Sequence, residues 1–247
     1  MFIDSHIHLQ DYKSQDVKNV VTNAAQNGVF RFINPSSHPS DWSKLATLAK
    51  KNRAVIPAFG IHPWYIDDAP SNWAEKLADM LNQNQAAWVG ECGIDRLKNT
   101  DTARQINILR AHIELAKKFN RPLIIHSVKA DSEMTALFHI LPQRTIFHSF
   151  TGSAEWGKSI QQHGFFIGLN FSILRKKNAA EILQQLNLQQ LLLETDGPYQ
   201  NIERGVETLP QNLPLLAEEI ALRLAIPYQE FVKIIIHNQQ KFLGEKS

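Results

Sequence analysis

The fold is decided by a stretch in which a short apolar run, an amphipathic segment and a second apolar run follow one another. Residues 87–125 read AWVGECGIDRLKNTDTARQINILRAHIELAKKFNRPLII. The runs at 87–89 and 122–125 are short and apolar, as in strands buried on both faces of a parallel sheet. Between them, segment 103–119 places its apolar residues on one helical stripe. These are Ile106, Leu109, Ile113 and Ala116. The stretch therefore predicts one strand–helix–strand unit of an α/β protein.

The same alternation extends over the whole chain of 247 residues. Eight apolar runs predict strands at 2–3, 29–33, 54–59, 87–89, 122–125, 145–147, 165–169 and 191–193. Helical spacing occurs at 14–27, 41–51, 71–83, 103–119, 132–141, 153–163 and 179–186. Successive strand ends lie about 22 to 35 residues apart, which is the length of one βα unit. Eight units predict a single (β/α)8 TIM barrel domain over residues 1–247, with additional C-terminal helices at 213–224 and 227–242. A doubly wound open sheet is the alternative.

Residues that favour helix ends support these boundaries. Ser71, Asp101 and Ser153 precede helical stretches, where their side chains can accept hydrogen bonds from the first turn. Gly28 and Gly164 follow helical stretches, where a left-handed residue is commonly required.

Composition limits the kind of partner. Lys and Arg total 26 against 24 Asp and Glu, so no broad basic field is available to hold duplex nucleic acid. Any nucleic-acid substrate must be held by a local group of side chains.

The single cysteine, Cys92, excludes an internal disulfide and suits a reducing compartment. Asp4 stands where a signal peptide would carry basic residues, and no apolar run approaches the roughly 18 residues of a membrane span. We expect a soluble cytoplasmic protein without membrane association.

Ligand-type side chains follow the predicted strands. His6 and His8 follow the first predicted strand and His62 follows the third, whereas Glu91 ends the fourth, His126 the fifth, His148 the sixth and Asp196 the eighth. The carboxyl ends of barrel strands converge on one face, which holds the active site in barrel enzymes. The sequence therefore predicts that these side chains meet in one pocket.

The pattern predicts a metal site. Residues two apart on a strand point to the same side, so His6 and His8 form a bidentate pair. Imidazole with carboxylate suits Zn²⁺, Mn²⁺ or Fe²⁺, and water-rich carboxylate sites also accept Mg²⁺. Without His62, four histidines and two carboxylates remain, which exceed the needs of one ion and fit two ions with Glu91 as the bridge. Taken singly, a His-x-His pair or a strand-end histidine is more often structural, and only the joint pattern favours the metal.

Other residues of the same types receive structural interpretations. Cys92 follows an inward-pointing residue, so we expect it to fill the core. Five further histidines lack a strand-end placement and are expected on the surface or in packing. They are His38, His112, His139, His163 and His237.

The ordered motifs resemble a known family. They are DSHIH (4–8), GIHP (60–63), GECGID (90–95), IHS (125–127), HSFTG (148–152), ETDGP (194–198) and the C-terminal Asn238 with Lys241 and Phe242. This set resembles the TatD-type metal-dependent deoxyribonucleases, which belong to the amidohydrolase-like barrels. The resemblance covers the chain from its first residues to its C-terminal helix.

The resemblance implies a site with two divalent ions. His6, His8 and Asp196 would hold one ion, His126 and His148 the other, and Glu91 would bridge them. Asp196 would also act as general base, and His62 would contact the scissile phosphate or its attacking water. The implied reaction is hydrolysis of a phosphodiester, in many members the stepwise removal of nucleotides from a 3′ end of single-stranded DNA. Mg²⁺, Mn²⁺ and Zn²⁺ are the candidate ions.

Two positions depart from the family pattern. Val128 stands where members often carry Arg, and the next residue, Lys129, is a candidate for the missing cation. The segment from Arg204 has Thr208 near an expected Asn. Both departures affect the expected substrate contacts and leave the ligand set intact.

Further candidates for substrate binding lie in loops at the same strand ends. Trp64 could stack on a splayed base, or it could pack its loop against the barrel rim. Arg175 begins a basic triplet that could attract phosphates, or it could be a solvated helix start. Both interpretations stay open for each residue.

Three functions compete. The leading one is a phosphodiesterase acting on DNA ends or a small phosphodiester. The second is a carbon–nitrogen hydrolase of the same barrel class, either an amidase or a deaminase. The bridging carboxylate Glu91 argues against it, since binuclear amidases often carry a carboxylated lysine there and a mononuclear deaminase needs no bridge. The third is a binding protein without catalysis, which the complete ligand set disfavours. No obligate protein partner is expected.

Overall fold

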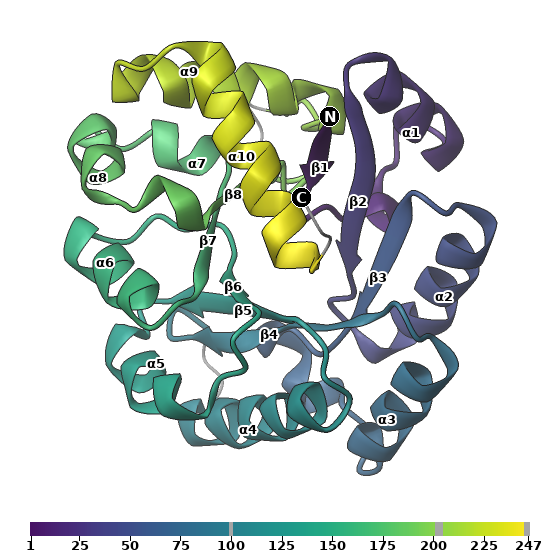
Figure 1. Ribbon diagram of the computed structural model, residues 1–247. Helices are drawn as coiled ribbons and strands as arrows, with labels where there is room; N and C mark the ends of the chain where they lie inside the picture. Colours follow the sequence, from purple (N-terminus) through teal and green to yellow (C-terminus); the bar gives the residue numbers. More distant parts are fainter. Residues whose placement is uncertain (99–100, 201–204, 245–247) are drawn as a thin grey trace. The chain divides into compact units, whose positions relative to one another are not determined.

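The computed structural model describes residues 1–98, 101–200 and 205–244. Eight parallel strands alternate with helices, and the strands follow one another in the sheet in the order β1 to β8 (Figure 1). This is the topology of a (β/α)8 barrel with additional C-terminal helices, as predicted. The strand order does not reverse, so the alternative of a doubly wound sheet is wrong.

The strands lie close to their predicted positions. They are β1 Phe2–Asp4, β2 Val29–Pro35, β3 Val55–Phe59, β4 Trp88–Asp95, β5 Leu123–Val128, β6 Thr145–Phe147, β7 Phe166–Leu169 and β8 Leu191–Leu193. The main differences are at β4 and β5, which continue past the apolar runs through polar residues. Glu91 and His126 therefore lie inside their strands, and the prediction that they end them is wrong.

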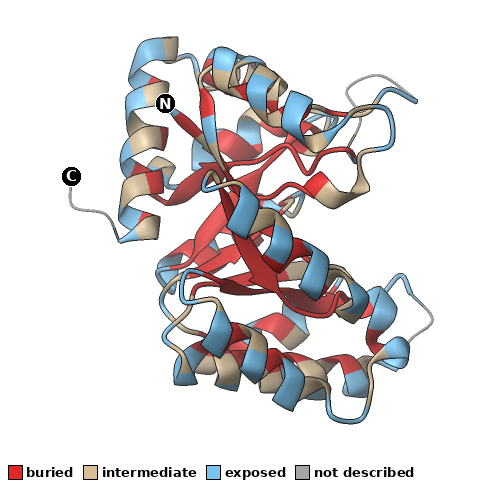
Figure 2. Ribbon diagram, turned by 90° about the vertical axis from the view of Figure 1, so that its right-hand side faces the viewer, coloured by how far each residue is buried: buried red, intermediate tan, exposed pale blue. Residues whose placement is uncertain are grey.

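The helices also match the amphipathic stretches. They are α1 Val17–Gln26, α2 Trp42–Lys51, α3 Trp73–Gln83, α4 Thr102–Lys118, α5 Asp131–Leu137, α6 Ala154–Gln162, α7 Phe171–Leu174, α8 Ala179–Gln185, α9 Leu213–Leu224 and α10 Tyr228–Leu243. Short 3-10 helices are η1 Leu9–Asp11, η2 Pro39–Asp41, η3 Pro63–Asp68, η4 Phe138–Ile140, η5 Leu188–Gln190 and η6 Pro210–Asn212. Figure 2 shows buried strands and helices that bury one face and expose the other.

The predicted N-cap residues are confirmed at two of three helix starts. Asp101 accepts a hydrogen bond from the Ala103 N–H at 2.9 Å, and Ser153 accepts one from the Trp156 N–H at 3.2 Å. The Ser71 prediction is wrong, because α3 begins two residues later. A turn closed by the Trp73 N–H and the Pro70 carbonyl, 2.9 Å apart, occupies the predicted first turn. Gly28 and Gly164 have the expected positive φ angles.

The chain divides into two compact units. Unit 1 comprises Met1–Ile33 and Ser149–Ser247, and unit 2 comprises Asn34–His148. A single domain over residues 1–247 stays a prediction.

In unit 1, α10 lies across β8 and β1 (Figure 1). Two of its amide side chains bind strand backbone. The Gln239 side chain exchanges hydrogen bonds with both backbone groups of Ile3, at 3.2 and 2.8 Å. The Asn238 Nδ2 donates to the carbonyls of Leu188 and Leu191, at 2.6 and 2.9 Å. These contacts fix β1 and β8, the strands that precede three of the predicted site residues.

In unit 2, β4 pairs in parallel with β3 and β5. Gly93 stands opposite His126 in this register, and a Cβ at Gly93 would lie 1.8 Å from the His126 carbonyl oxygen. Only glycine permits this approach of the two strands. Helix α4 packs on β4, and its buried face holds Leu109, Ile113 and Ala116 of the predicted stripe together with Gln105 and His112, whereas Ile106 is half-buried. The close packing places Glu91 and His126 on adjacent strands.

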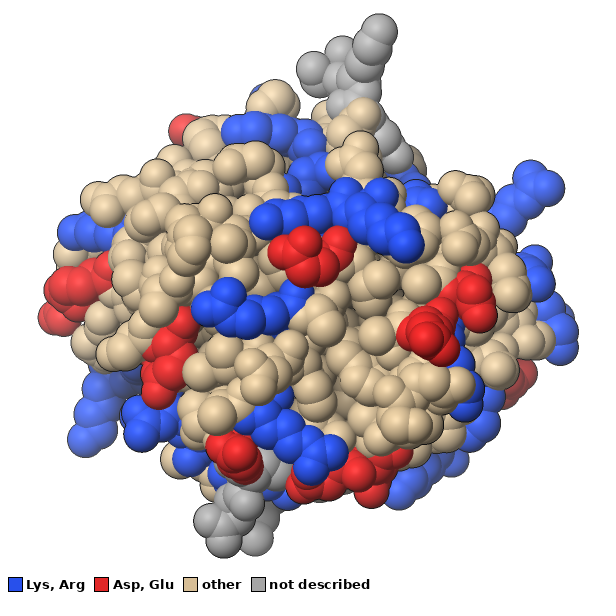
Figure 3. Space-filling model, turned by 90° about the horizontal axis from the view of Figure 1, so that it is seen from below, with Lys and Arg blue, Asp and Glu red and all other residues tan. Residues whose placement is uncertain are grey.

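Charge on the surface is mixed. On the face drawn in Figure 3, basic and acidic side chains are interspersed among neutral ones. This distribution matches the near balance of charges in the sequence. Among the described residues, no helix is both long and apolar enough to span a membrane.

Candidate metal centre

In unit 1, two histidines after β1 and one aspartate after β8 form a buried cluster, here the His6 cluster. The Nε2 atoms of His6 and His8 lie 3.2 Å apart. The Asp196 Oδ1 lies 3.8 Å from the first and 3.6 Å from the second. All three residues are buried. Within unit 1, the structure therefore brings three of the predicted metal ligands together.

A buried carboxylate holds the backbone of this cluster. The Asp4 Oδ1 accepts hydrogen bonds from the N–H groups of Thr195 and His6, at 2.9 and 3.3 Å, and its Oδ2 accepts from the Thr195 hydroxyl at 2.5 Å. Burial raises the pKa of Asp4 to about 7, against the Thr195 hydrogen bonds, which lower it. The Asp196 N–H donates to the His6 carbonyl at 2.9 Å. Asp4 thus joins the two segments that carry the cluster.

A second buried carboxylate supports the segment after β8. The Glu194 Oε1 accepts hydrogen bonds from the Ser149 N–H at 2.6 Å and the Asn170 amide at 3.3 Å. Asp4 and Glu194 belong to the motifs DSHIH and ETDGP, but neither motif predicted these supporting roles. In the sequence, each of these two carboxylates directly follows an apolar run. A carboxylate buried at a strand end must be hydrogen-bonded, so this position could have indicated a supporting role.

In unit 2, four side chains form a second group, here the Glu91 cluster. The Glu91 Oε1 lies 2.6 Å from the His148 Nε2, 2.9 Å from the His126 Nδ1 and 3.5 Å from the His62 Nε2. The His126 Nδ1 is also 3.2 Å from the His62 Nε2 and 3.3 Å from the His148 Nε2. One buried carboxylate oxygen therefore faces three imidazole nitrogens.

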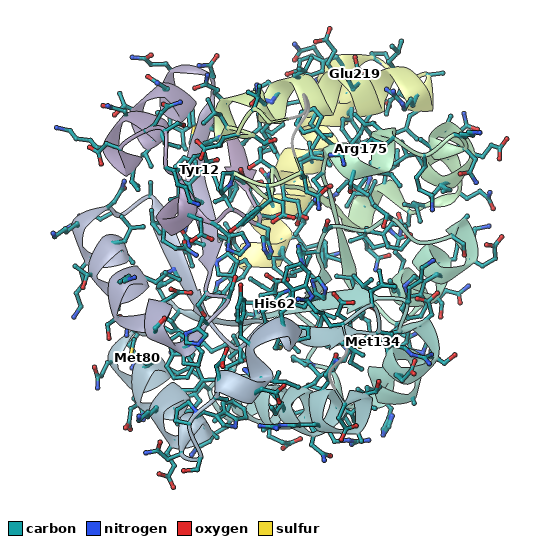
Figure 4. All side chains as sticks on the ribbon, turned by 180° about the vertical axis from the view of Figure 1, so that it is seen from behind. Tyr12, His62, Met80, Met134, Arg175 and Glu219 are labelled. Carbon is teal, nitrogen blue, oxygen red and sulfur yellow. The ribbon has the colours of Figure 1, made fainter. Side chains whose placement is uncertain are left out.

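The His62 ring is oriented by its own loop. His62 precedes η3, and its Nδ1 accepts a hydrogen bond from the Trp64 N–H at 3.1 Å. The neutral ring therefore carries its proton on Nε2, the atom nearest Glu91. His62 is labelled in Figure 4.

Asp95, at the end of β4, contacts the far side of His126. Its Oδ2 lies 3.4 Å from the His126 Nε2 and accepts a hydrogen bond from the Trp64 Nε1–H at 2.6 Å. Burial raises the pKa of Asp95, but the hydrogen bonds from His126, Trp64 and the Leu97 N–H outweigh it and hold the pKa below its ordinary range. Burial lowers the pKa of His126, but its bonds to Asp95 and Glu91 leave it above the ordinary value. Asp95 belongs to the GECGID motif, but its contacts with His126 and Trp64 could not be predicted from the motif.

The donor atoms in both clusters suit a divalent cation. In each cluster, two ring nitrogens that can offer lone pairs lie within 3.3 Å of each other and beside a carboxylate oxygen: the Nε2 atoms of His6 and His8, and the His126 Nδ1 with the His148 Nε2. In unit 2, one ligand atom from each of His62, Glu91 and His126 lies within 4.8 Å of the others. Imidazole and carboxylate together are the ligands of Zn²⁺ and Mn²⁺ sites. A cation relieves the contact between facing nitrogen lone pairs, so the residues present fit a bound metal.

The predicted substrate contacts lie on loops. Trp64 is 47% exposed, and the Lys98 Nζ lies 4.6 Å from its ring centroid. Lys129 is exposed after β5, next to a half-buried Val128. Arg175 is exposed after α7 and is labelled in Figure 4. Contact of Trp64, Lys129 and Arg175 with a substrate stays a prediction.

Thr208, at one of the two departures from the family pattern, is buried. The Thr208 carbonyl accepts a hydrogen bond from the Tyr12 hydroxyl at 2.6 Å; Tyr12 is also labelled in Figure 4. Arg204, which begins that segment, lies outside the described residues.

Comparison with known proteins identifies the family. Residues 3–244 match the family model described as TatD related DNase. The chain belongs to the TatD family. This TatD protein is 30% identical over 206 residues to the uncharacterized metal-dependent hydrolase YjjV of Escherichia coli, covering 80% of this chain and 79% of the relative. It is 26% identical over 256 residues to human deoxyribonuclease TATDN3, covering 97% and 93%.

The solved structures agree with the fold. The crystal structure of YjjV, a TatD homologue from Escherichia coli, superposes with a TM-score of 0.92 at 26% identity and covers 99% of this chain and 98% of that one. The family resemblance of the sequence is therefore confirmed, and the TatD protein described here is a metal-dependent hydrolase.

Proposed function

We propose that this TatD hydrolase is a deoxyribonuclease that removes nucleotides from the 3′ ends of single-stranded DNA with two divalent ions. The observation that carries the proposal is the Glu91 cluster, where one buried carboxylate oxygen lies within 3.5 Å of three histidine nitrogens. Family membership and the name of the human relative support the choice of a phosphodiester substrate.

Each cluster has a proposed role. His6, His8 and Asp196 would hold one ion, His126 and His148 would hold the second, and Glu91 would be a ligand of both. When bound, the ions lower the pKa of a water molecule and neutralise charge on the phosphate. Mg²⁺, Mn²⁺ and Zn²⁺ are the candidates, since imidazole and carboxylate ligands accept all three.

The protein side chains handle the protons and the charge. Asp196 accepts the proton of the attacking water. The water oxygen forms a bond to phosphorus as the bond to the 3′ oxygen breaks, and the departing 3′ oxygen takes a proton from solvent. His62, with its proton on Nε2, donates a hydrogen bond to a phosphate oxygen. Trp64, Lys129 and Arg175 are the proposed contacts to the base and to neighbouring phosphates.

A substrate and metal screen tests the proposal. Purified protein is incubated with single-stranded DNA labelled at its 5′ end, in Mg²⁺, Mn²⁺ or Zn²⁺. We expect a ladder of products shortened from the 3′ end, which is lost on chelation and in E91Q and H6A. The exposed His139 gives the matched control H139Q, which keeps full activity.

Other outcomes contradict the proposal. Cutting within the strand rejects the direction of attack, and cleavage of RNA alone rejects the DNA substrate. Inactivity on every oligonucleotide and simple phosphodiester with all three ions rejects phosphodiesterase function. Ammonia release from cyclic amides or nucleobases would establish the carbon–nitrogen alternative instead.

The proposed location is the cytoplasm. Cys92, the single cysteine, is buried and free. Fractionation of cells that express the chain with a C-terminal tag tests this, and recovery outside the cytoplasmic fraction rejects it.

A further inference from the structure

Asp95 is held rigidly at the end of β4. Its Oδ1 accepts a hydrogen bond from the Leu97 N–H at 2.8 Å. Its backbone N–H and carbonyl both bind the Gln105 side chain of α4, at 2.7 and 3.1 Å. Only 3% of the residue is exposed. The carboxylate therefore has one orientation, with Oδ2 directed toward Trp64 and His126.

The two nitrogens of His126 face different partners. Nδ1 lies 2.9 Å from the Glu91 Oε1, inside the Glu91 cluster. Nε2 faces the Asp95 Oδ2, 3.4 Å away. An ionised carboxylate can only accept a hydrogen bond, so its partner nitrogen carries the proton. The other nitrogen then keeps its lone pair, which is the atom a metal needs.

We propose that Asp95 is a positioning residue for the metal centre. It fixes the His126 ring with Nε2 protonated and Nδ1 directed into the Glu91 cluster, and Trp64 in turn fixes the Asp95 carboxylate. The inference rests on the proposed function in one respect, that His126 is a metal ligand.

Trp64 supports this arrangement from the loop after β3. Its indole N–H donates to the same oxygen, Asp95 Oδ2, that faces His126. Lys98 covers one face of the indole, with Nζ 4.6 Å from the ring centroid. The exposed tryptophan is therefore tied through Asp95 to a metal ligand, in addition to its proposed contact with substrate.

Zinc affinity tests the proposal without a substrate. Zinc binding is measured by competition with a chromophoric chelator for the unsubstituted protein, D95A, D95N and W64F. We expect D95A to bind zinc about 10- to 100-fold more weakly, as is usual when the partner of a metal-bound histidine is removed. W64F, which keeps an aromatic ring but no N–H, weakens binding less. D101N is the matched control, since Asn also caps α4, and it binds zinc as tightly as the unsubstituted protein.

D95N separates positioning from packing. Asn has nearly the size of Asp, so a packing role predicts that D95N is milder than D95A. All three partners of the carboxylate are N–H donors, and an amide NH₂ cannot accept from them. If the NH₂ group faces His126, it favours a proton on Nδ1, where the metal binds. In the other orientation the NH₂ group meets the Leu97 N–H, so that two donors face each other. We therefore expect D95N to weaken zinc binding in either orientation.

A spectroscopic measurement gives a second readout. In zinc-loaded protein labelled with ¹⁵N-histidine, the His126 Nε2 proton is expected to exchange slowly with water, because Asp95 accepts it. The resonance is assigned by its absence in H126Q. It is lost in D95A and kept in D101N.

The outcomes separate the two proposals. If the unsubstituted protein binds no divalent ion, the proposed function and this inference both fail. If it binds zinc and cleaves DNA, but D95A and D95N bind zinc as D101N does, the inference alone is overturned. Thermal unfolding in chelator shows whether D95A folds. If D95A does not fold, two other results together overturn the inference. They are fast exchange of the His126 ring proton with water in the unsubstituted protein, and zinc binding by W64F as tight as that of the unsubstituted protein.

Discussion

A buried histidine in α4 makes the stability of this protein depend on pH. His112 is fully buried and stacks on Trp73, with ring centroids 4.6 Å apart and an interplanar angle of 22°. Its Nε2 accepts a hydrogen bond from the Ile61 N–H at 3.2 Å, and its Nδ1 lies 2.8 Å from the Ile108 carbonyl. Burial lowers the pKa of His112 from 6.5 to about 4, against the Ile108 hydrogen bond, which raises it. The folded protein therefore keeps this ring neutral.

The direction of the effect follows from proton binding. Between pH 6.5 and pH 4, the unfolded chain binds a proton at His112 and the folded chain does not. Stability from this residue is complete above pH 6.5 and is lost as the pH falls through that window. With these two pKa values, the loss is roughly 2 kcal/mol at pH 5 and about 3 kcal/mol once the pH is below 4.

Urea unfolding at pH 8 and pH 5 measures this loss. The comparison uses H112Q, whose amide can still accept from Ile61 and donate to Ile108 but does not titrate. Chelator is present throughout, so that metal binding does not contribute. We expect the drop in free energy of unfolding from pH 8 to pH 5 to be roughly 2 kcal/mol smaller in H112Q than in the unsubstituted protein.

The control is H139Q, which removes an exposed histidine from the same unit. Its pH dependence is expected to match that of the unsubstituted protein. Equal drops in H112Q and H139Q would refute the assignment of the pH dependence to His112.

Three further substitutions test the packing of the strands and helix ends by urea unfolding. G93A places a methyl group against the His126 carbonyl and is expected to lower the free energy of unfolding by more than about 3 kcal/mol. A folded G93A variant of unchanged stability contradicts the observed register of β4 with β5. N238A removes the two side-chain hydrogen bonds to the Leu188 and Leu191 carbonyls in unit 1, although Leu188 keeps the one from the Leu191 N–H, and it is expected to lower the free energy of unfolding by about 2 kcal/mol. A loss below 0.5 kcal/mol, roughly that of a surface substitution, contradicts this role. D101A removes the N-cap of α4 and is expected to lower the free energy of unfolding by about 1 kcal/mol. The free energy of unfolding of D101N is expected to stay near that of the unsubstituted protein, because Asn also caps a helix.

Most of the secondary structure could be predicted because its signals are local. The runs at 145–147 and 191–193 are the observed β6 and β8, and 213–224 is the observed α9. Apolar periodicity reports which face of a segment is buried, and each segment carries that information by itself. Capping residues act over three or four positions, so Asp101 and Ser153 could be identified from their neighbours.

The prediction failed where a local signal was absent or ambiguous. β4 and β5 continue through Glu91 and His126, where polar residues interrupt the apolar run. A strand that carries site residues necessarily breaks the apolar pattern that reveals strands. Ser71 failed for a different reason, because a turn from Pro70 begins before the helix does.

By itself, the sequence determined the order of strands and helices and the family, and it predicted the metal ligands. Only the tertiary structure decided how polar groups pair. Asp95 meets Trp64 and His126 across about 30 positions of sequence, His112 binds the backbone of Ile61, and Asp4 binds Thr195. A hydrogen bond depends on the distance between two atoms to within a few tenths of an ångström. Apolar periodicity assigns a side chain to a face, but it cannot set that distance between residues on different elements.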